Sequence, residues 1–145
     1  MSDPAQRLAE RVVAGMLERD AFSRWLGVEL RALSPGRCEL AMAVRDDMVN
    51  GFGVCHGGIA FSLADSALAF ASNTHGRVTV SIENTITYPK GVAVGDVLTA
   101  TADEESASNR LAFYRVKVTT ASDDVVALFT GTVYRTNQEF FPSDE

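Results

Sequence analysis

Cysteine and histidine are scarce in this sequence. Its 145 residues include two cysteines, Cys38 and Cys55, and two histidines, His56 and His75. Cysteines in this number, without CxxC spacing, build neither a disulfide framework nor a thiolate metal pair. Two histidines also argue against a histidine-rich metal centre. We therefore expect a reduced, cytoplasmic protein that holds no metal ion.

Long apolar runs and an excess of positive charge are also missing. The longest apolar stretch consists of residues 51–64 and their continuation beyond Asp65, which interrupts it. It also contains several serines and alanines. It therefore predicts the buried helix of a soluble protein rather than a membrane span. The first residues mix acids and bases without the apolar segment of a secretory signal. Thirteen lysines and arginines against nineteen acids give a formal net charge of −6, which argues against non-specific nucleic-acid binding.

The order of apolar and polar residues predicts a single α+β domain over residues 1–145. We expect helices over 4–19 and about 56–73, a short segment over 21–26, and strands over 28–33, 38–44, 79–88, 97–105, 111–120 and 125–136. Because the central helix is apolar on nearly all sides, we expect an antiparallel sheet to wrap around it. Residues 1–27 are expected to form an N-terminal helical segment, 28–136 the core, and 137–145 a loose tail.

The central helix has a single charged residue, Asp65, between Gly57 and Asn73. A carboxylate in apolar surroundings has its pKa raised by desolvation, which suits a general base. The alternative is that Asp65 lies on a solvated stripe with Ser62, Ser66 and Asn73. Sequence physics leaves both interpretations open.

Two glycines, Gly57 and Gly58, begin this helix. Backbone N–H groups and the helix dipole favour negative charge at a helix start, so these N–H groups suit a carbonyl oxygen that becomes an oxyanion. The alternative is that the pair merely permits a tight turn into the helix.

Geometry constrains how Gly57 and Asp65 could act together. They are eight residues apart in the sequence, which is a rise of roughly 12 Å along a helix. A reacting carbon must lie about 3 Å from both the oxyanion donor and the attacking group. If both residues act, they are expected to come from different subunits, in a dimer with two equivalent composite sites.

The segment VNGFGVCHGGIAFSLADSALAFASNTHG resembles the helix signature of the PaaI-type hotdog thioesterases of phenylacetate degradation. It is also similar to the related thioesterase superfamily member 2 type. The segments VSIENTITYPKGVAVGDVLTATA, SNRLAFYRVKV and VVALFTGTVYR resemble later strands of that family. The resemblance spans about residues 22–136. It implies a hotdog fold, with a five- or six-stranded antiparallel sheet around the central helix, and dimers that pair into a tetramer.

The resemblance also implies hydrolysis of an acyl-CoA thioester without a metal or redox cofactor, and we expect an aryl-acyl group such as phenylacetyl or a hydroxylated relative. By position, it implies that the Gly57 N–H is the oxyanion donor, that His56 supports this loop and that Asn50 positions the water or the thioester. It also implies that Asp65 of the opposite subunit is the base or nucleophile, and that the Ser81 hydroxyl holds the water.

A second set of positions concerns the substrate. The resemblance implies that five turn residues meet the pantetheine and phosphates of CoA: Tyr88, Lys90, Gly91, Asn109 and Arg110. Lysine and arginine bind phosphate as a point charge and a planar fork respectively, although a cation in a turn is often merely solvated. Further candidates along the helix are Gly58 at its start, Phe61 for the acyl pocket and Ser66 beside the carboxylate.

Other chemistries have less support. Adjacent Cys55 and His56 could be a thiol and its base, but neighbours in sequence rarely face each other, and an inert buried cysteine is favoured. The chain has no GxSxG elbow and no phosphate-binding loop. Two rival functions stay open: a hotdog hydratase or dehydratase, and a non-catalytic acyl-CoA-binding regulatory module.

Overall fold

The computed structural model describes residues 3–142. Its elements are α1 (Pro4–Arg19), α2 (Ala21–Leu26), β1 (Glu29–Ser34), β2 (Arg37–Ala43), the short 3-10 helix η1 (Asp46–Met48), α3 (Gly57–Asn73), β3 (Arg77–Thr87), β4 (Val97–Ala107), β5 (Leu111–Thr120) and β6 (Val125–Glu139). The expected α+β order is confirmed, and apart from the end of β6 the expected boundaries lie within two residues of those observed. None of the helices in the described residues has the length and apolar content needed to cross a membrane.

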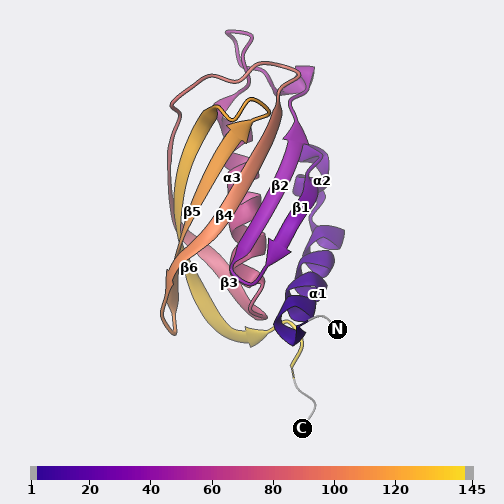
Figure 1. The fold of residues 1–145 in the computed structure, drawn as a ribbon, viewed down its shortest axis with the longest axis vertical. Coiled ribbons are helices and arrows are strands. Elements are labelled where there is room, and N and C mark those ends of the chain that lie inside the picture. Colours follow the sequence, from indigo (N-terminus) through magenta and orange to yellow (C-terminus); the bar gives the residue numbers. More distant parts are fainter. Residues whose placement is uncertain (1–2, 143–145) are drawn as a thin grey trace.

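The strands of residues 3–142 form one six-stranded antiparallel sheet in the order β1-β2-β4-β5-β6-β3. Figure 1 shows this sheet curved around α3, with α1 and α2 beside β1. This is the expected hotdog arrangement. The two edges of the sheet are β1 and β3, and β3 reaches the rest of the sheet through its pairing with β6.

The concave side of the sheet packs on α3. Along β5, buried and exposed positions alternate, and Val116 and Val118 are fully buried. From α3, Leu63 and Phe70 are equally buried in the same cluster. Burying one such side chain contributes about 1.5–3 kcal/mol. The core therefore fixes α3 inside the sheet, and with it the residues at the start and middle of this helix.

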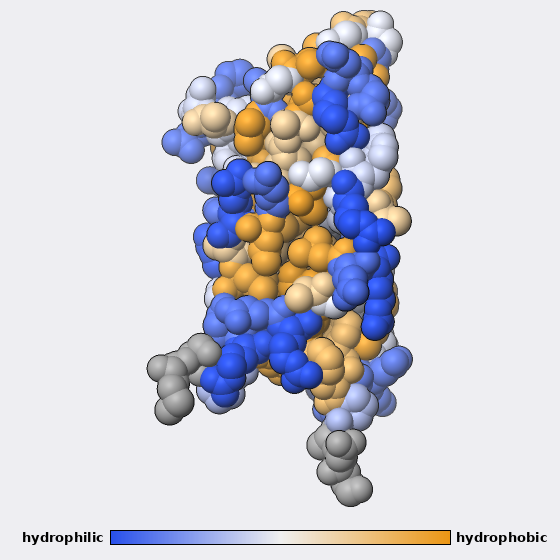
Figure 2. Space-filling view, turned by 90° about the vertical axis from the view of Figure 1, so that its right-hand side faces the viewer, coloured by the Kyte–Doolittle hydropathy of each residue, from blue (hydrophilic) through white to orange (hydrophobic). Residues whose placement is uncertain are grey.

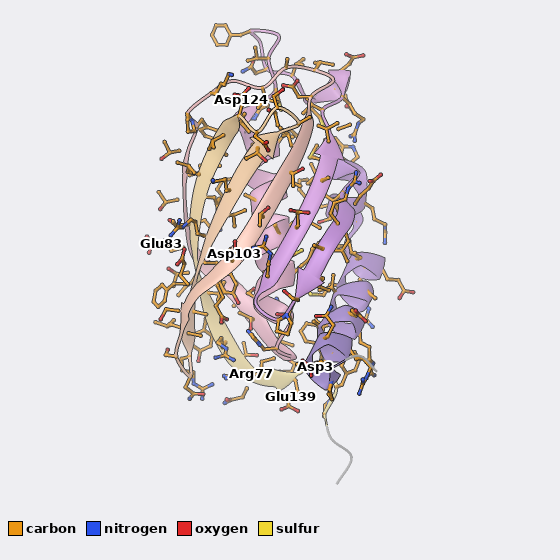
Figure 3. The ribbon with its side chains drawn as sticks, viewed as in Figure 1. Asp3, Arg77, Glu83, Asp103, Asp124 and Glu139 are labelled. Carbon is orange, nitrogen blue, oxygen red and sulfur yellow. The ribbon has the colours of Figure 1, made fainter. Side chains whose placement is uncertain are left out.

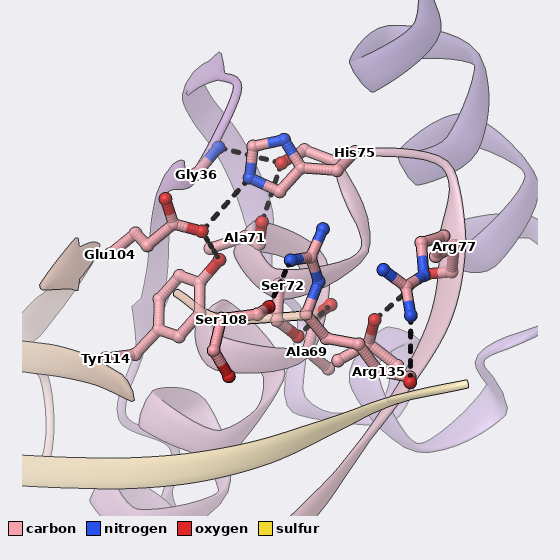
Figure 4. A network of polar contacts seen from close by, with 12 residues as sticks. Gly36, Ala69, Ala71, Ser72, His75, Arg77, Glu104, Ser108, Tyr114 and Arg135 are labelled. Atoms are coloured by element: carbon pink, nitrogen blue, oxygen red, sulfur yellow. Dashed lines mark hydrogen bonds and ion pairs between the residues drawn. The ribbon is translucent and has the colours of Figure 1, made fainter. Parts of the chain in front are cut away.

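Polar contacts hold the C-terminal end of α3 (Figure 4). His75, just beyond the helix, contacts Glu104 Oε1 through Nε2 at 3.1 Å, and the Tyr114 hydroxyl donates to the same oxygen at 2.9 Å. The Gly36 N–H donates to Thr74 Oγ1 at 2.8 Å. These bonds anchor the end of α3 to β4, β5 and the β1–β2 turn.

The N-terminal helix α1 forms where the sequence predicts it. The Asp3 carboxylate accepts a hydrogen bond from the Ala5 N–H at 3.1 Å, and Pro4 occupies the first turn. Val12 and Val13 are buried. From the side of the molecule that α1 and α2 occupy, apolar residues form a long band between hydrophilic borders (Figure 2).

The tail expected from residue 137 is wrong for the residues that the structure describes. Strand β6 continues to Glu139, which pairs with Arg77 of β3 at the end of the molecule opposite Asp124 (Figure 3). The Phe140 N–H then donates to the Gly76 carbonyl at 2.9 Å, and the Arg11 guanidinium lies 4.0 Å from the Phe141 ring centroid. Strand pairing and the contact with α1 order a polar segment whose composition favours a loop. The remainder of the expected tail, 143–145, lies outside the described residues.

Candidate active site

The start of α3 is capped by His56. Its Nδ1 accepts a hydrogen bond from the Gly58 N–H at 2.8 Å. Because Nδ1 is the acceptor, the ring proton of the neutral imidazole lies on Nε2. A side chain at position 58 would also crowd the imidazole, since a Cβ there would lie 3.0 Å from Nδ1. His56 therefore supports the turn that leads into α3.

Gly57 presents a backbone donor at this turn. Within residues 3–142 its N–H has no hydrogen-bond acceptor, whereas its carbonyl accepts from the Tyr88 hydroxyl at 2.8 Å. A Cβ at position 57 would lie 3.2 Å from the Tyr88 ring. An N–H at the start of a 17-residue helix is suited to bind an anion or a developing oxyanion.

A cavity of about 330 Å³ opens beside this turn. The sequence-predicted residues that line it are His56, Gly57, Tyr88, Lys90 and Gly91. The Lys90 ammonium forms an exposed ion pair with the Asp124 carboxylate at 2.9 Å. The structure thus brings three of the five turn residues expected to meet CoA, namely Tyr88, Lys90 and Gly91, to the start of α3.

Asp65 lies two turns further along α3 and is partly buried. Burial raises the pKa of its carboxyl above the ordinary value of 3.8; the Asn84 side chain opposes this shift, and the negative charge of Asp20 adds to it. Asn84 Nδ2 donates to Asp65 Oδ1 at 3.4 Å. Such a carboxylate retains its proton to higher pH than a solvated one, which suits a base near neutral pH.

The solvated-stripe alternative for Asp65 does not describe this structure. Ser66 is buried and shares a 2.8 Å hydrogen bond with the Ser23 hydroxyl of α2. Asn73 is also buried, and its Oδ1 accepts from the Thr79 N–H at 2.8 Å. The polar residues of α3 therefore serve packing contacts, and Asp65 is a partly buried charge among them.

Asn50 lies in the loop between η1 and α3. Its Oδ1 accepts hydrogen bonds from the Phe52 N–H at 2.9 Å and the Val54 N–H at 3.4 Å. Its side-chain carbonyl is thus used by the loop, and within residues 3–142 its Nδ2 donates no hydrogen bond. Any contact from this side chain to a substrate would come from the amide N–H₂ group. Phe52, at the tip of the same loop, is 93% exposed.

Ser81, on β3, donates its hydroxyl proton to Asn84 Oδ1 at 2.8 Å. Its link to Asp65 therefore runs through Asn84, a residue that the sequence analysis missed. The strand pattern could have revealed Asn84. It lies two residues before Ile86, which packs against the core, and strand residues two apart share a face. A polar residue at an inward position of a strand needs a partner.

The other two residues expected to meet CoA, Asn109 and Arg110, lie at the opposite end of the folded molecule. Asn109 and Arg110 occupy the β4–β5 turn, where the Arg77 guanidinium donates to the Asn109 carbonyl at 2.9 Å. Arg110 donates to Asn137 Oδ1 at 2.6 Å. Within one protomer these residues are not brought together with Lys90, which pairs with Asp124 at the other end (Figure 3).

Two further residues resolve as packing groups. The Phe61 ring meets Phe129 edge-to-face with centroids 5.3 Å apart, so Phe61 belongs to the wall between α3 and β6.

Burial, followed by the charge of Asp96, raises the pKa of the Cys55 thiol. A thiol held protonated is a poor nucleophile, so this environment argues against Cys55 as a nucleophile with His56 as its base. Among residues 3–142, no cluster of three or more His, Cys, Asp or Glu side chains is placed to hold a metal ion.

Comparison with known proteins gives a consistent result. The model of the thioesterase superfamily matches residues 52–127. The chain is 39% identical over 137 residues to a putative esterase of Archaeoglobus fulgidus, covering 94% of this chain and 89% of that protein. It is 36% identical over 120 residues to the acyl-coenzyme A thioesterase PaaI of Escherichia coli, covering 83% and 86% respectively.

Solved structures agree. The E. coli PaaI protein from the phenylacetic acid degradation operon superposes with a TM-score of 0.91 at 32% identity, covering 93% of this chain and 98% of that one. A mutant of the phenylacetic acid degradation protein PaaI from Thermus thermophilus superposes with a TM-score of 0.78 at 41% identity, covering 81% and 100%. The chain therefore belongs to the thioesterase superfamily and has the hotdog fold and thioester hydrolase class that the sequence predicts.

Proposed function

We propose that this protein hydrolyses an aryl-acyl-CoA, such as phenylacetyl-CoA or a hydroxylated relative, in sites built by two protomers. Asp65 of one protomer and the Gly57 N–H of the other would face one thioester. The observation that carries this proposal is that each group is prepared for chemistry by its own contacts, yet the two lie eight residues apart on one helix. A rise of roughly 12 Å separates them, so one copy of α3 cannot serve one carbonyl with both.

The edge strand β3 supports assembly in pairs. Val80 and Ile82 are 49% and 57% exposed on this strand. An exposed apolar edge strand readily pairs with a second copy of itself. Pairing of two β3 strands about a twofold axis would place two antiparallel copies of α3 in symmetric positions. Pairing of such dimers into a tetramer belongs to the same proposal.

The proposed chemistry begins with the thioester carbonyl at the Gly57 N–H. As a water oxygen attacks the carbonyl carbon, Asp65 takes a proton from that water, and the N–H stabilises the negative charge that develops on the carbonyl oxygen. Collapse of the tetrahedral intermediate breaks the C–S bond, and the proton passes to the CoA thiolate. Direct attack by the Asp65 carboxylate, followed by hydrolysis of an anhydride, is the alternative route to the same products.

Asn50 would act as a donor in this scheme. Because its Oδ1 already accepts two loop N–H groups, its Nδ2 is the part that can approach a substrate. We therefore assign Asn50 to the thioester oxygen or sulfur rather than to the acceptance of a proton from water.

The CoA moiety would extend from the cavity at the start of α3. Lys90 lines this cavity and carries an exposed ammonium. Arg110 lies at the far end of the same protomer, so it would reach the same CoA only from another protomer of the assembly. No cofactor beyond the substrate's CoA is required. A cytoplasmic location fits two free, buried cysteines, Cys38 and Cys55.

The aryl-acyl preference is supported by the two PaaI proteins of phenylacetic acid degradation to which the chain is similar. The direct test is a thiol-release assay over acyl-CoAs of varied length and aromaticity, with wild type and Asp65→Asn compared. We expect phenylacetyl-type esters to give the highest kcat/KM, and Asp65→Asn to lose at least about a thousandfold. Water addition to an enoyl-CoA without thiol release, or tight binding without turnover, would identify the hydratase or the binding module instead.

The composite site has its own test. Asp65→Ala and Gly57→Pro chains are each expected to be inactive, whereas their mixture, after subunit exchange, regains one complete site in each mixed dimer. Recovery of up to about half the wild-type activity in those dimers is expected from twofold symmetry. Failure to recover activity, with mixed dimers demonstrated by mass spectrometry, would rule out sites shared between chains.

A further inference from the structure

Asp65 is attached to β3 through a short chain of hydrogen bonds. Asn84 Nδ2 donates to Asp65 Oδ1 at 3.4 Å, and the Ser81 hydroxyl donates to Asn84 Oδ1 at 2.8 Å. On the basis of the proposed function, we infer that Asn84 is a positioning residue that holds Asp65 ionised and aimed, and that Ser81 holds Asn84 in the orientation this requires.

The ionised carboxylate of Asp65 fixes which end of the Asn84 amide it meets, because it only accepts hydrogen bonds. A side-chain amide has one accepting oxygen and one donating nitrogen, and rotation by half a turn exchanges them. With Asn84 Oδ1 engaged by the Ser81 hydroxyl, Nδ2 faces the carboxylate. An N–H donor favours the ionised carboxylate, whereas a flipped amide would place oxygen against oxygen. Asp65 therefore selects the orientation of Asn84, and Ser81 holds the amide in it by donating to the oxygen that this orientation turns away from the carboxylate.

The sheet is built to leave room for this amide. Asn84 pairs across β3 and β6 with Gly131. A Cβ on Gly131 would lie 2.9 Å from Asn84 Oδ1 and 2.6 Å from Leu68 Cδ2 of α3. Both distances are shorter than real Cβ contacts allow, so any other residue at 131 would displace the side chain of Asn84 or of Leu68. The glycine is thus a requirement of the Asn84 position.

The charges near Asp65 show why a donor is needed. Within residues 3–142, the titratable group that acts on Asp65 from the packed elements is Asp20, at the junction of α1 and α2. Asp20 is held there by the Ser23 N–H at 2.9 Å and the Ser23 hydroxyl at 2.6 Å. Burial and Asp20 both favour protonated Asp65, while β3 contributes the neutral amide of Asn84, which favours the ionised form. A base must be ionised to accept a proton, so Asn84 keeps in check the two influences that favour the protonated form.

The experiment measures the pH dependence of kcat/KM for Asn84→Ala, Asn84→Asp and Ser81→Ala, with Thr85→Ala as the control on the same strand. Removal of the donor is expected to move the acid limb to higher pH, with about a tenfold loss at pH values below the limb and recovery above it, since hydrogen bonds to charged groups are the strong ones. Asn84→Asp, which adds a carboxylate, should move the limb further, and Ser81→Ala less far. Thr85→Ala should leave the profile unchanged.

A second readout works without turnover. The carboxyl ¹³C chemical shift of Asp65 is followed through a pH titration in wild type and in Asn84→Ala, after thermal melting has shown that both are folded. We expect the midpoint of Asp65 to rise in the variant. An unchanged midpoint and an unchanged acid limb would overturn the inference even if Asp65 is essential. If instead Asp65→Asn keeps full thioesterase activity, the proposed function fails, while the titration still decides whether Asn84 acts on Asp65.

Discussion

The hydroxyl of Tyr88 donates a hydrogen bond of 2.8 Å to the carbonyl oxygen of Gly57. This bond joins the end of β3 to the first residue of α3, where the backbone N–H proposed to bind the oxyanion is located. The Tyr88 ring also fills the space that a side chain at position 57 would need. One aromatic residue thereby holds the peptide that follows Gly57 and leaves little room for a side chain at position 57.

Replacement of Tyr88 by phenylalanine is expected to lower kcat severalfold with the fold intact. The peptide that follows Gly57 would lose one hydrogen bond, worth about 0.5–1.5 kcal/mol net, and the start of α3 would be less rigidly held. Tyr134→Phe is a matched control, because Tyr134 is 40% exposed on β6. Steady-state kinetics of the two variants decide the matter, and equal effects from both would refute a specific role for the Tyr88 hydroxyl.

Replacement of Asp65 by asparagine should stabilise the protein at neutral pH while abolishing activity. Burial raises the pKa of Asp65 above its ordinary value of 3.8. The folded state then binds a proton more tightly than the unfolded state, so stability is full below pH 3.8 and declines as pH rises through the raised pKa. Asparagine does not ionise and escapes this decline.

Calorimetric melting of wild type and Asp65→Asn across pH 3–8 measures the difference. The gain in Tm of the variant should be present at pH 7 and shrink towards acid pH. A gain that is independent of pH would mean that the ionisation of Asp65 is not its source. Stabilisation by removal of a buried charge, at the expense of function, is typical of active sites.

Placement of charge on the exposed edge of β3 is expected to produce monomers without activity. Ile82→Lys puts an ammonium on the edge proposed to pair with a second copy, and like charges would then meet across the twofold axis. Sedimentation velocity and thiol release are measured on the same samples. Leu128→Lys is the control, since Leu128 is 42% exposed but lies on β6, which has a neighbouring strand on each side. Active monomers would contradict the composite site.

Loss of the two proposed phosphate contacts should weaken substrate binding more than turnover. Lys90→Ala and Arg110→Ala are each expected to raise KM for the CoA ester by about three- to tenfold, with kcat little changed, because they bind a part of the substrate remote from the reaction. The increase should diminish at high salt. Lys117→Ala, on the exposed face of β5, tests the effect of charge removal by itself. A KM that both variants leave unchanged would remove these residues from the CoA site.

Much of the fold could be predicted because its core follows simple periodicities. The alternation in residues 111–120 and the apolar helix around Asp65 correspond to β5 and α3. The end of β6 was mispredicted because Asn137 and Glu139 are polar, and Glu139 is ordered by pairing with Arg77, some sixty residues away in sequence. Local composition carries no information on a partner at that separation.

The site was predictable in its principal groups and not in its connections. Asp65 and the glycines at the start of α3 differ from their apolar surroundings, which made them visible in the sequence. Asn84 was missed because its importance depends on a register that places it opposite Gly131 and within reach of α3. The separation of Lys90 from Arg110 likewise follows from the length of the strands, which turns alone do not reveal.

The position of β3 at the sheet edge has a consequence for synthesis on the ribosome. Strand β3 spans Arg77–Thr87, but its partner β6, at Val125–Glu139, is the last of the strands in residues 3–142 to be made. Until those final residues emerge, the segment that bears Ser81 and Asn84 has no strand to pair with inside its own chain. The side of β3 that faces β6 therefore stays unpaired while nearly forty intervening residues are synthesised, and Ser81 and Asn84 take their places in the sheet only after Val125–Glu139 has been made.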